Sequence, residues 1–156
     1  MSFCVQRSTN VRYRSPAVCT PPGDDEIWED PRQPTGRPGF RAPHATVSLG
    51  GEERSTLDLF GRRFVVLAGA EGDAWSAAAS AAAAELGVEL DAYRLGAGLE
   101  DRCGAVAELY GIGPRGAALV RPDGFVAWRA SAAAADADRA LRQALGAALA
   151  RPQRAV

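Results

Sequence analysis

The sequence predicts an α/β sandwich, a central mixed sheet flanked by helices, preceded by an irregular N-terminal arm. Three observations lead to this expectation. A short apolar run at residues 64–68, rich in β-branched residues, is followed by an alanine-rich helical segment. An Asp-Gly pair at 123–124 separates two apolar runs, which is typical of a β-hairpin. Leucines at 141, 145 and 149 form one apolar stripe of a closing helix.

The first segment, residues 1–43, is predicted to be the arm. It is rich in Pro, Gly, Arg and Asp, and its one strand-like piece is residues 11–15. From 21 to 43 prolines and glycines recur every few residues, so we expect a connecting segment without a core of its own. The lone Trp28 in this segment must pack either on the following domain or on a partner.

A regular domain is predicted over residues 44–150, with a disordered tail at 151–156. Its expected elements are a strand (45–49), a buried strand (64–68), a helix (75–86), a strand (88–95), a short helix (101–110), two hairpin strands (116–121 and 125–129) and a helix (136–150). The core order β-α-β-α-β-β-α is that of a thioredoxin-like sandwich.

Local signals mark the ends of these elements. Gly87 follows the first helix as a C′ glycine, and Gly50-Gly51 predicts a turn after the first strand. Asp136 or Asp138 is expected to cap the last helix.

Thiol-disulfide chemistry is not expected on this scaffold. It needs a thiolate at the N-terminus of the first helix, where the helix dipole stabilises the anion. The segment 69–75 contains no sulfur, and its acids Glu71 and Asp73 would disfavour a thiolate. The redox members also place a cis-proline before the first hairpin strand; Gly116 occupies that place, with Pro114 two residues early.

The cysteines and the single histidine predict neither a disulfide framework nor a zinc site, because Cys4, Cys19 and Cys103 are widely spaced. Cys103 follows an arginine, but two acids precede that arginine and no histidine is close in sequence, so we expect an inert thiol. His44, at the junction of arm and domain, has no nearby serine or cysteine nucleophile and is expected to make a structural hydrogen bond.

Composition limits the partners. The formal net charge is −1, so nucleic acid and membranes are not expected partners. All 18 basic residues are arginine, as in GC-rich actinobacterial genomes. No signal peptide and no apolar run long enough to span a bilayer are found, which predicts a cytoplasmic protein. No complete dinucleotide-binding or P-loop glycine motif is present either.

Four segments, read together, resemble a known family. They are residues 37–44 (RPGFRAPH), 55–61 (STLDLFG), 110–112 (YGI) and 116–129, which includes RPDGFVAWR. The set is similar to the C-terminal region of class A FAD-dependent aromatic hydroxylases, especially actinomycete polyketide hydroxylases related to phenol hydroxylase. The resemblance covers about residues 13–129.

The resemblance implies a thioredoxin-like domain without redox cysteines, appended to an FAD domain and a substrate domain. It also implies that residues 13–18 are the last strand of the substrate domain. The family's motifs for FAD and NAD(P)H lie upstream and have no counterparts here. We therefore expect no catalytic, cofactor-binding or metal-binding residue, and no enzymatic activity of the chain on its own.

Three functions remain open. The first is a non-catalytic module that docks on a flavin monooxygenase subunit or self-associates, with a free strand edge at 11–15 and candidate interface residues Tyr13, Trp28, Arg41 and His44. The second is a truncated or split FAD-dependent monooxygenase whose catalytic domain lies upstream. The third is an independent small-molecule binding protein.

Overall fold

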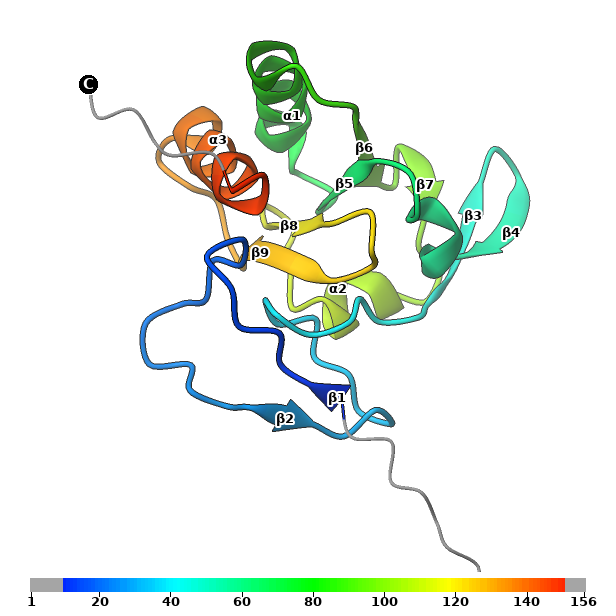
Figure 1. The fold of residues 1–156 in the computed structure, drawn as a ribbon. Helices are drawn as coiled ribbons and strands as arrows, with labels where there is room; N and C mark the ends of the chain where they lie inside the picture. The colour runs from blue at the N-terminus through cyan, green and yellow to red at the C-terminus, as the bar shows by residue number, and fades with distance from the viewer. Residues whose placement is uncertain (1–9, 151–156) are drawn as a thin grey trace, which may run out of the picture.

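The computed structural model describes residues 10–150, which form a seven-stranded mixed sheet and a separate two-stranded ribbon (Figure 1). The large sheet has the order β4-β3-β7-β6-β5-β8-β9. At its centre β5 (Phe64–Ala68) is parallel to β6 (Leu90–Leu95) and antiparallel to β8 (Ala117–Val120), which pairs with β9 (Val126–Ala130). This is the predicted thioredoxin-like arrangement, and the fold class is confirmed.

Three further strands widen the sheet on one side. The β3 strand (Thr46–Leu49) forms a hairpin with β4 (Glu52–Ser55) through the predicted glycine turn, and β7 (Gly98–Glu100) joins β3 to β6. A 3₁₀ turn, η1 (Thr56–Leu59), follows β4. The sequence analysis missed β4 because its residues are mostly charged, as suits an exposed edge strand.

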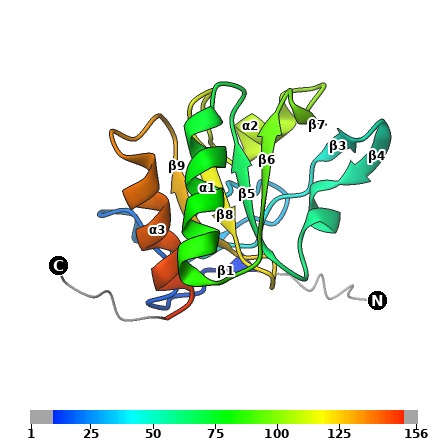
Figure 2. The ribbon, with the colours of Figure 1, turned by 90° about the horizontal axis from the view of Figure 1, so that it is seen from above.

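The helices cover the two faces of the sheet unequally (Figure 2). The helices α1 (Asp73–Leu86) and α3 (Ala137–Ala148) lie side by side on one face, and α2 (Ala105–Leu109) lies on the other. Gly87 ends α1 in the left-handed region at φ 63°, as predicted. Asp136 caps α3 by accepting from the Arg139 N–H at 2.8 Å.

The helix α2 is shorter than predicted because Asp101 stays outside it. Its carboxylate accepts hydrogen bonds from the backbone N–H groups of Ala105 (3.0 Å) and Val106 (2.8 Å). With a longer bond from the Ala107 N–H (3.4 Å), the carboxylate satisfies three of the unpaired donors of the first turn.

Side-chain alternation along β5 divides the core into two layers. Val65 and Leu67 face α2, where Tyr110 is fully buried. Val66 and Ala68 face α1 and α3 and pack in the layer that contains Trp75.

The arm is fixed to the sheet edge by backbone pairing. The Gly39 N–H donates to Val126 O (2.8 Å), and the Val126 N–H donates to Phe40 O (2.9 Å). The Ala42 N–H donates to Gly124 O (2.8 Å), so this stretch runs along the start of β9. The Phe40 side chain is completely buried.

The arm also contains a strand pair that the sequence analysis did not predict. The β1 strand (Asn10–Val11) is antiparallel to β2 (Trp28–Glu29), with Val11 opposite Trp28. The expected free strand edge at 11–15 is therefore wrong: the Arg12 N–H bonds to Ile27 O (2.9 Å) and the Tyr13 N–H to Gly39 O (2.7 Å). The partner strand has two residues, too few for a periodic pattern. The predicted tail, 151–156, lies outside the described residues.

Phe40→Ala is expected to lower the free energy of unfolding by about 3–5 kcal/mol, the usual cost of emptying a buried phenylalanine site. The measurement is urea unfolding of the purified chain. Phe125→Ala, which truncates a half-buried ring, serves as the control and should cost clearly less. An equal loss for the two variants would contradict the tight packing of the arm.

Candidate functional site

The position at which thioredoxin-like redox enzymes carry their thiolate is closed in this chain. It is the turn from β5 into α1, where the Gly69 N–H donates to Gly116 O (2.9 Å) and the Glu71 N–H to Pro114 O (2.8 Å). A Cβ built on Gly69 would lie 2.3 Å from Gly113 O. The turn is thus packed backbone against backbone, with no space for a side chain at Gly69.

The two cysteines that the structure describes lie away from this turn. Cys19 and Cys103 are free thiols; Cys103 is exposed before α2, and burial raises the pKa of the Cys19 thiol. A raised pKa disfavours the thiolate that attacks disulfides. Within residues 10–150 no three His, Cys, Asp or Glu side chains gather to hold a metal ion. Cys4 lies outside the described residues.

The start of α1 does not fit the pyrophosphate of FAD. Such a cradle needs glycine space and unopposed N–H groups at a helix N-terminus. Here the space beside Gly69 is filled by residues 113–114, and the first turn carries Asp73, whose carboxylate lies 3.2 Å from Arg94 Nε. The carboxylates of Glu71 and Asp73 would repel a phosphate at this helix.

A hollow of about 490 Å³ lies beside this turn, between the ends of β5 and β6 and the start of α2. Gly69, Leu95 and Ile112 are among its lining residues. Its rim carries Asp101, whose carboxylate is already bonded to α2, and Arg102, which lies 3.6 Å from Glu100. The charged rim groups are thus paired within the chain, and no reactive group faces the hollow.

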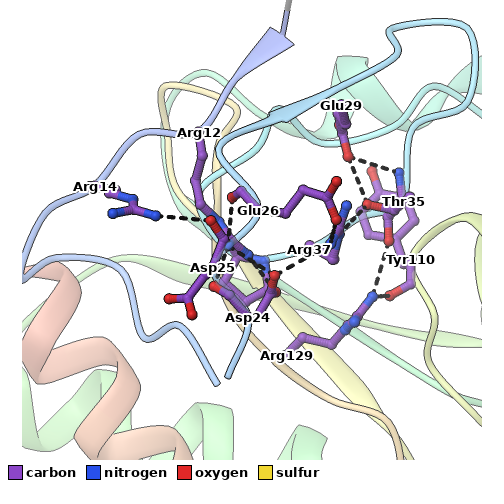
Figure 3. A network of polar contacts seen from close by, with 11 residues as sticks. Arg12, Arg14, Asp24, Asp25, Glu26, Glu29, Thr35, Arg37, Tyr110 and Arg129 are labelled. Carbon is purple, nitrogen blue, oxygen red and sulfur yellow. Dashed lines mark hydrogen bonds and ion pairs between the residues drawn. The ribbon is translucent and has the colours of Figure 1, made fainter. Parts of the chain in front are cut away.

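The densest polar cluster lies in the arm, around Arg12 (Figure 3). Its side chain is 1% exposed, and it donates to the carbonyls of Pro38 (2.9 Å), Asp24 (2.7 Å) and Glu26 (2.9 Å). It also donates to the Asp24 carboxylate, which Arg37 approaches at 3.3 Å. These bonds fold the 24–26 loop onto residues 37–38.

These contacts change the pKa values of two groups in and beside the cluster, Asp24 and Arg129. The hydrogen bond from Arg12 lowers the pKa of the Asp24 carboxyl most; burial opposes this, and the positive charges of Arg12 and Arg37 lower the pKa further. Burial lowers the pKa of the Arg129 guanidinium, and the nearby charge of Arg37 adds to this.

Arg129 joins the arm to the domain. From β9 its Nη1 donates to Thr35 O (3.0 Å) in the arm and to Tyr110 O (3.2 Å) at the end of α2. Gly36 is required at this contact, because a Cβ there would lie 2.5 Å from Tyr110 Cα. The Tyr110 hydroxyl donates to Pro43 O (2.8 Å), and burial raises its pKa. The arginines of this cluster thus bind groups of their own chain and act structurally.

Two of the four predicted interface residues come together. Tyr13 packs against Phe125 with ring centroids 5.8 Å apart, and the Arg41 guanidinium lies 4.8 Å above the Phe125 ring. Arg121 lies 5.2 Å above the Tyr13 ring. The sequence analysis missed Phe125 and Arg121, because only the pairing of residues 39–42 with β9 brings them to the arm.

Trp28 lies on the ribbon of β1 and β2, beside Val11. Five large hydrophobic side chains are exposed among residues 10–150, and four of them belong to this ribbon or its continuation: Val11, Tyr13, Ile27 and Trp28. We call these four residues the ribbon patch. The fifth, Leu57, belongs to η1. For Val11, the sequence signal that could have predicted an exposed side chain was the alternation of apolar and charged residues over 11–13.

His44 lies apart, beside η1. Its Nδ1 is 2.7 Å from Ser55 Oγ, so the predicted structural hydrogen bond is present. The expectation that no serine lies near His44 is wrong, because the β3–β4 hairpin returns Ser55 to it. Ser55 Oγ also accepts from the Leu57 N–H (3.1 Å) and caps η1. No carboxylate within residues 10–150 orients His44, so the pair lacks the third group of a triad.

In the part of the chain that the structure describes, no helix is both long and apolar enough to span a membrane.

Comparison with known proteins identifies relatives of this scaffold. Residues 35–152 match the family model described as aromatic-ring hydroxylase, C-terminal. Aklavinone 12-hydroxylase RdmE of Streptomyces purpurascens is 57% identical over 134 residues, 86% of this chain and 25% of the relative. The 4-methyl-5-nitrocatechol 5-monooxygenase of a Burkholderia species is 47% identical over 146 residues, 90% of this chain and 27% of the relative.

A solved structure shows the same fold. The crystal structure of a ternary complex of aklavinone-11 hydroxylase with FAD and aklavinone superposes with a TM-score of 0.87 at 55% identity, covering 91% of this chain and 26% of that one. The chain therefore spans about a quarter of the length of the relatives it matches.

Asp24→Asn is expected to lower the free energy of unfolding at pH 7 by about 2 kcal/mol, because it removes a charge-assisted partner of the buried Arg12. Since the folded-state pKa of Asp24 is lowered, its contribution is complete above the unfolded-state pKa of about 3.9. This contribution is lost as the pH falls through the folded-state pKa of Asp24. Urea unfolding of both proteins across acidic pH measures the difference.

The neighbouring variant Asp25→Asn is the control, because the exposed Asp25 carboxylate forms no ion pair within residues 10–150. It should leave the pH profile of stability unchanged. A constant Asp24→Asn effect down to the lowest pH tested would contradict the ionic role of Asp24.

The chain is expected to reduce insulin disulfides no faster than its variant with Cys4, Cys19 and Cys103 all replaced by serine. The reason is that, among residues 10–150, no thiol lies at the closed turn before α1. Insulin turbidity with dithiothreitol measures the rate; a cysteine-dependent acceleration would show that a thiol does reach disulfides.

Proposed function

The chain belongs to the family of aromatic-ring hydroxylase C-terminal domains, and we propose that it is the non-catalytic C-terminal module of an FAD-dependent aromatic hydroxylase of the polyketide type. In this role it associates with the flavin- and substrate-binding part and stabilises it. FAD and NAD(P)H bind to that larger part, and this module binds neither. The proposal is the same whether the larger part lies on the same polypeptide or on a separate subunit.

The observation that carries the proposal has two parts: the chain matches only part of the length of flavin-dependent relatives, and its described residues form no site for the flavin. The chain matches about a quarter of the length of RdmE and of the nitrocatechol monooxygenase, and the structure with the TM-score of 0.87 is that of an enzyme complexed with FAD and aklavinone. In this chain, which corresponds to that quarter, the start of α1 is closed and acidic, and the arginine cluster is satisfied internally. A hydroxylase of this family would thus hold its flavin elsewhere.

The polyketide type is supported by the similarity to aklavinone hydroxylase. The chain is 57% identical to RdmE and 55% identical to the aklavinone-11 hydroxylase structure, against 47% to the nitrocatechol monooxygenase and 45% to the tetracenomycin A2 monooxygenase-dioxygenase of Streptomyces glaucescens. The free thiols of Cys19 and Cys103 favour a reducing compartment, and we place the module in the cytoplasm.

The test uses the aklavinone 12-hydroxylase RdmE with its matching C-terminal quarter removed. We expect this chain, added in trans, to co-elute with the truncated enzyme, raise its melting temperature and improve its retention of FAD. The chain alone should elute without flavin absorbance. Flavin bound tightly by the chain alone would contradict the proposal.

A covalent chimera covers the case in which the truncated enzyme does not fold. In it this chain replaces the C-terminal quarter of RdmE, and we expect aklavinone hydroxylation within about tenfold of the native enzyme. The matched control carries Phe40→Ala in the chimera and should lose stability and FAD. If neither the mixture nor the chimera improves on the truncated enzyme, the proposed role is wrong.

A further inference from the structure

We propose that the ribbon patch, together with Arg41, is the surface by which the module contacts the flavin- and substrate-binding part of the hydroxylase. The partner surface would be apolar opposite the patch and would carry a carboxylate opposite Arg41. This inference rests on the proposed function and assigns its contact surface.

The register of the ribbon creates an apolar outer side. Val11 and Trp28 are directly opposed, so their side chains leave the ribbon on the same side. Val11 is 61% exposed and Trp28 is 55% exposed, whereas their neighbours Arg12 and Glu29 are buried. Tyr13, two residues after Val11, is 45% exposed. Apolar side chains thus face solvent while charged ones face the domain, the reverse of an ordinary surface ribbon.

The buried side holds the ribbon in place. The Glu29 carboxylate accepts from Asn10 Nδ2 (2.9 Å) and from Thr35 Oγ1 (2.7 Å), and Arg12 is bonded as described above. An isolated two-stranded ribbon is marginal in water, so this polar anchoring is needed. The result is a fixed apolar surface with an exposed tryptophan, a residue type enriched at binding hot spots.

One end of the surface carries an available cation. Tyr13 continues the patch to Phe125, and Arg41 lies over that ring at 4.8 Å. Arg121, over Tyr13, is already paired with Asp123 at 2.7 Å. Arg41 is exposed and has no carboxylate partner within residues 10–150. Stacking on Phe125 orients its guanidinium, whose fork of N–H groups suits a partner carboxylate.

The location of the patch favours the larger part of the hydroxylase as its occupant. The matched family is a C-terminal region, so in a full-length relative the larger part precedes it in sequence. β1 is the first element that the structure describes, and in Figure 1 β1 and β2 lie together on the side of the sheet away from α1 and α3. The patch is therefore at the end of the module nearest, along the chain, to what precedes it in the relatives.

The experiment measures binding of this chain to truncated RdmE by titration calorimetry, with four variants. Trp28→Ala is expected to raise the dissociation constant at least tenfold, the usual effect of truncating an aromatic side chain at the centre of an interface. Arg41→Glu is expected to raise the dissociation constant at least tenfold at low salt and by less at high salt, because the interaction that is lost is an ion pair.

The controls are Leu57→Ala, which truncates a side chain 48% exposed outside the patch, and Arg62→Glu, which reverses an exposed charge elsewhere. Both should bind like the wild type. All four variants alter exposed side chains, and urea unfolding checks that each is folded. The same substitutions in the covalent chimera, read out as melting temperature, provide a second measurement.

The outcomes separate the two proposals. If the wild-type chain does not bind and the chimera is no more stable than truncated RdmE, the proposed function fails. If the wild type binds and Trp28→Ala and Arg41→Glu bind equally well, the function stands and the contact surface is wrong. If the two variants instead abolish self-association of the chain, measured by light scattering, and leave hydroxylase binding intact, the patch joins two copies of this chain and the inference is overturned.

Discussion

The placement of the arm depends on one buried charge, the guanidinium of Arg12. A buried charge is tolerated only when its donors are fully used, and here three carbonyls and one carboxylate meet that demand. To supply them, the 24–26 loop and residue 38 must converge on one point. That convergence places Phe40 beneath two arginines, with Arg12 and Arg37 at 5.0 and 5.5 Å from the ring centre. It also holds the ribbon with its apolar side outward.

The thioredoxin-like scaffold and thiol-disulfide chemistry are separable for a physical reason. The sheet needs the buried side chains of β5 and β8, covered by α1 and α3 on one face and by α2 on the other. A redox site would need space and a thiol at the turn before α1. In this chain glycine at 69 lets the turn after the central strand β5 pack directly on residues 113–116, so the tight packing of the turn leaves no space for the site. Fold class alone therefore predicted nothing about activity.

Sequence patterns predicted the elements whose side chains alternate or repeat over several residues. The strand at 64–68, the end of α1 at Gly87 and the Asp-Gly hairpin are all present. The patterns failed where pairing depends on distant partners. β1 and β2 have two residues each, and the bonds of Arg12 to Pro38 O and of Glu29 to Thr35 hold them in the arm. Tyr13 and Arg41 were predicted as interface residues, but their shared contact with Phe125 could not be predicted, because it depends on the pairing of residues 39–42 with the start of β9.

The side chains of the proposed contact surface are not the ones that stabilise the module. Val11, Tyr13 and Trp28 of the ribbon patch are exposed and contribute little to the core, whereas the anchoring bonds of Arg12 and Glu29 lie on the opposite side of the ribbon. Loss of Trp28 should therefore affect association without unfolding, and loss of Asp24 should loosen the ribbon and so affect both. A surface built this way can change its apolar side chains to suit a partner while the buried polar side keeps its geometry, which is a reason for placing charge inside and tryptophan outside.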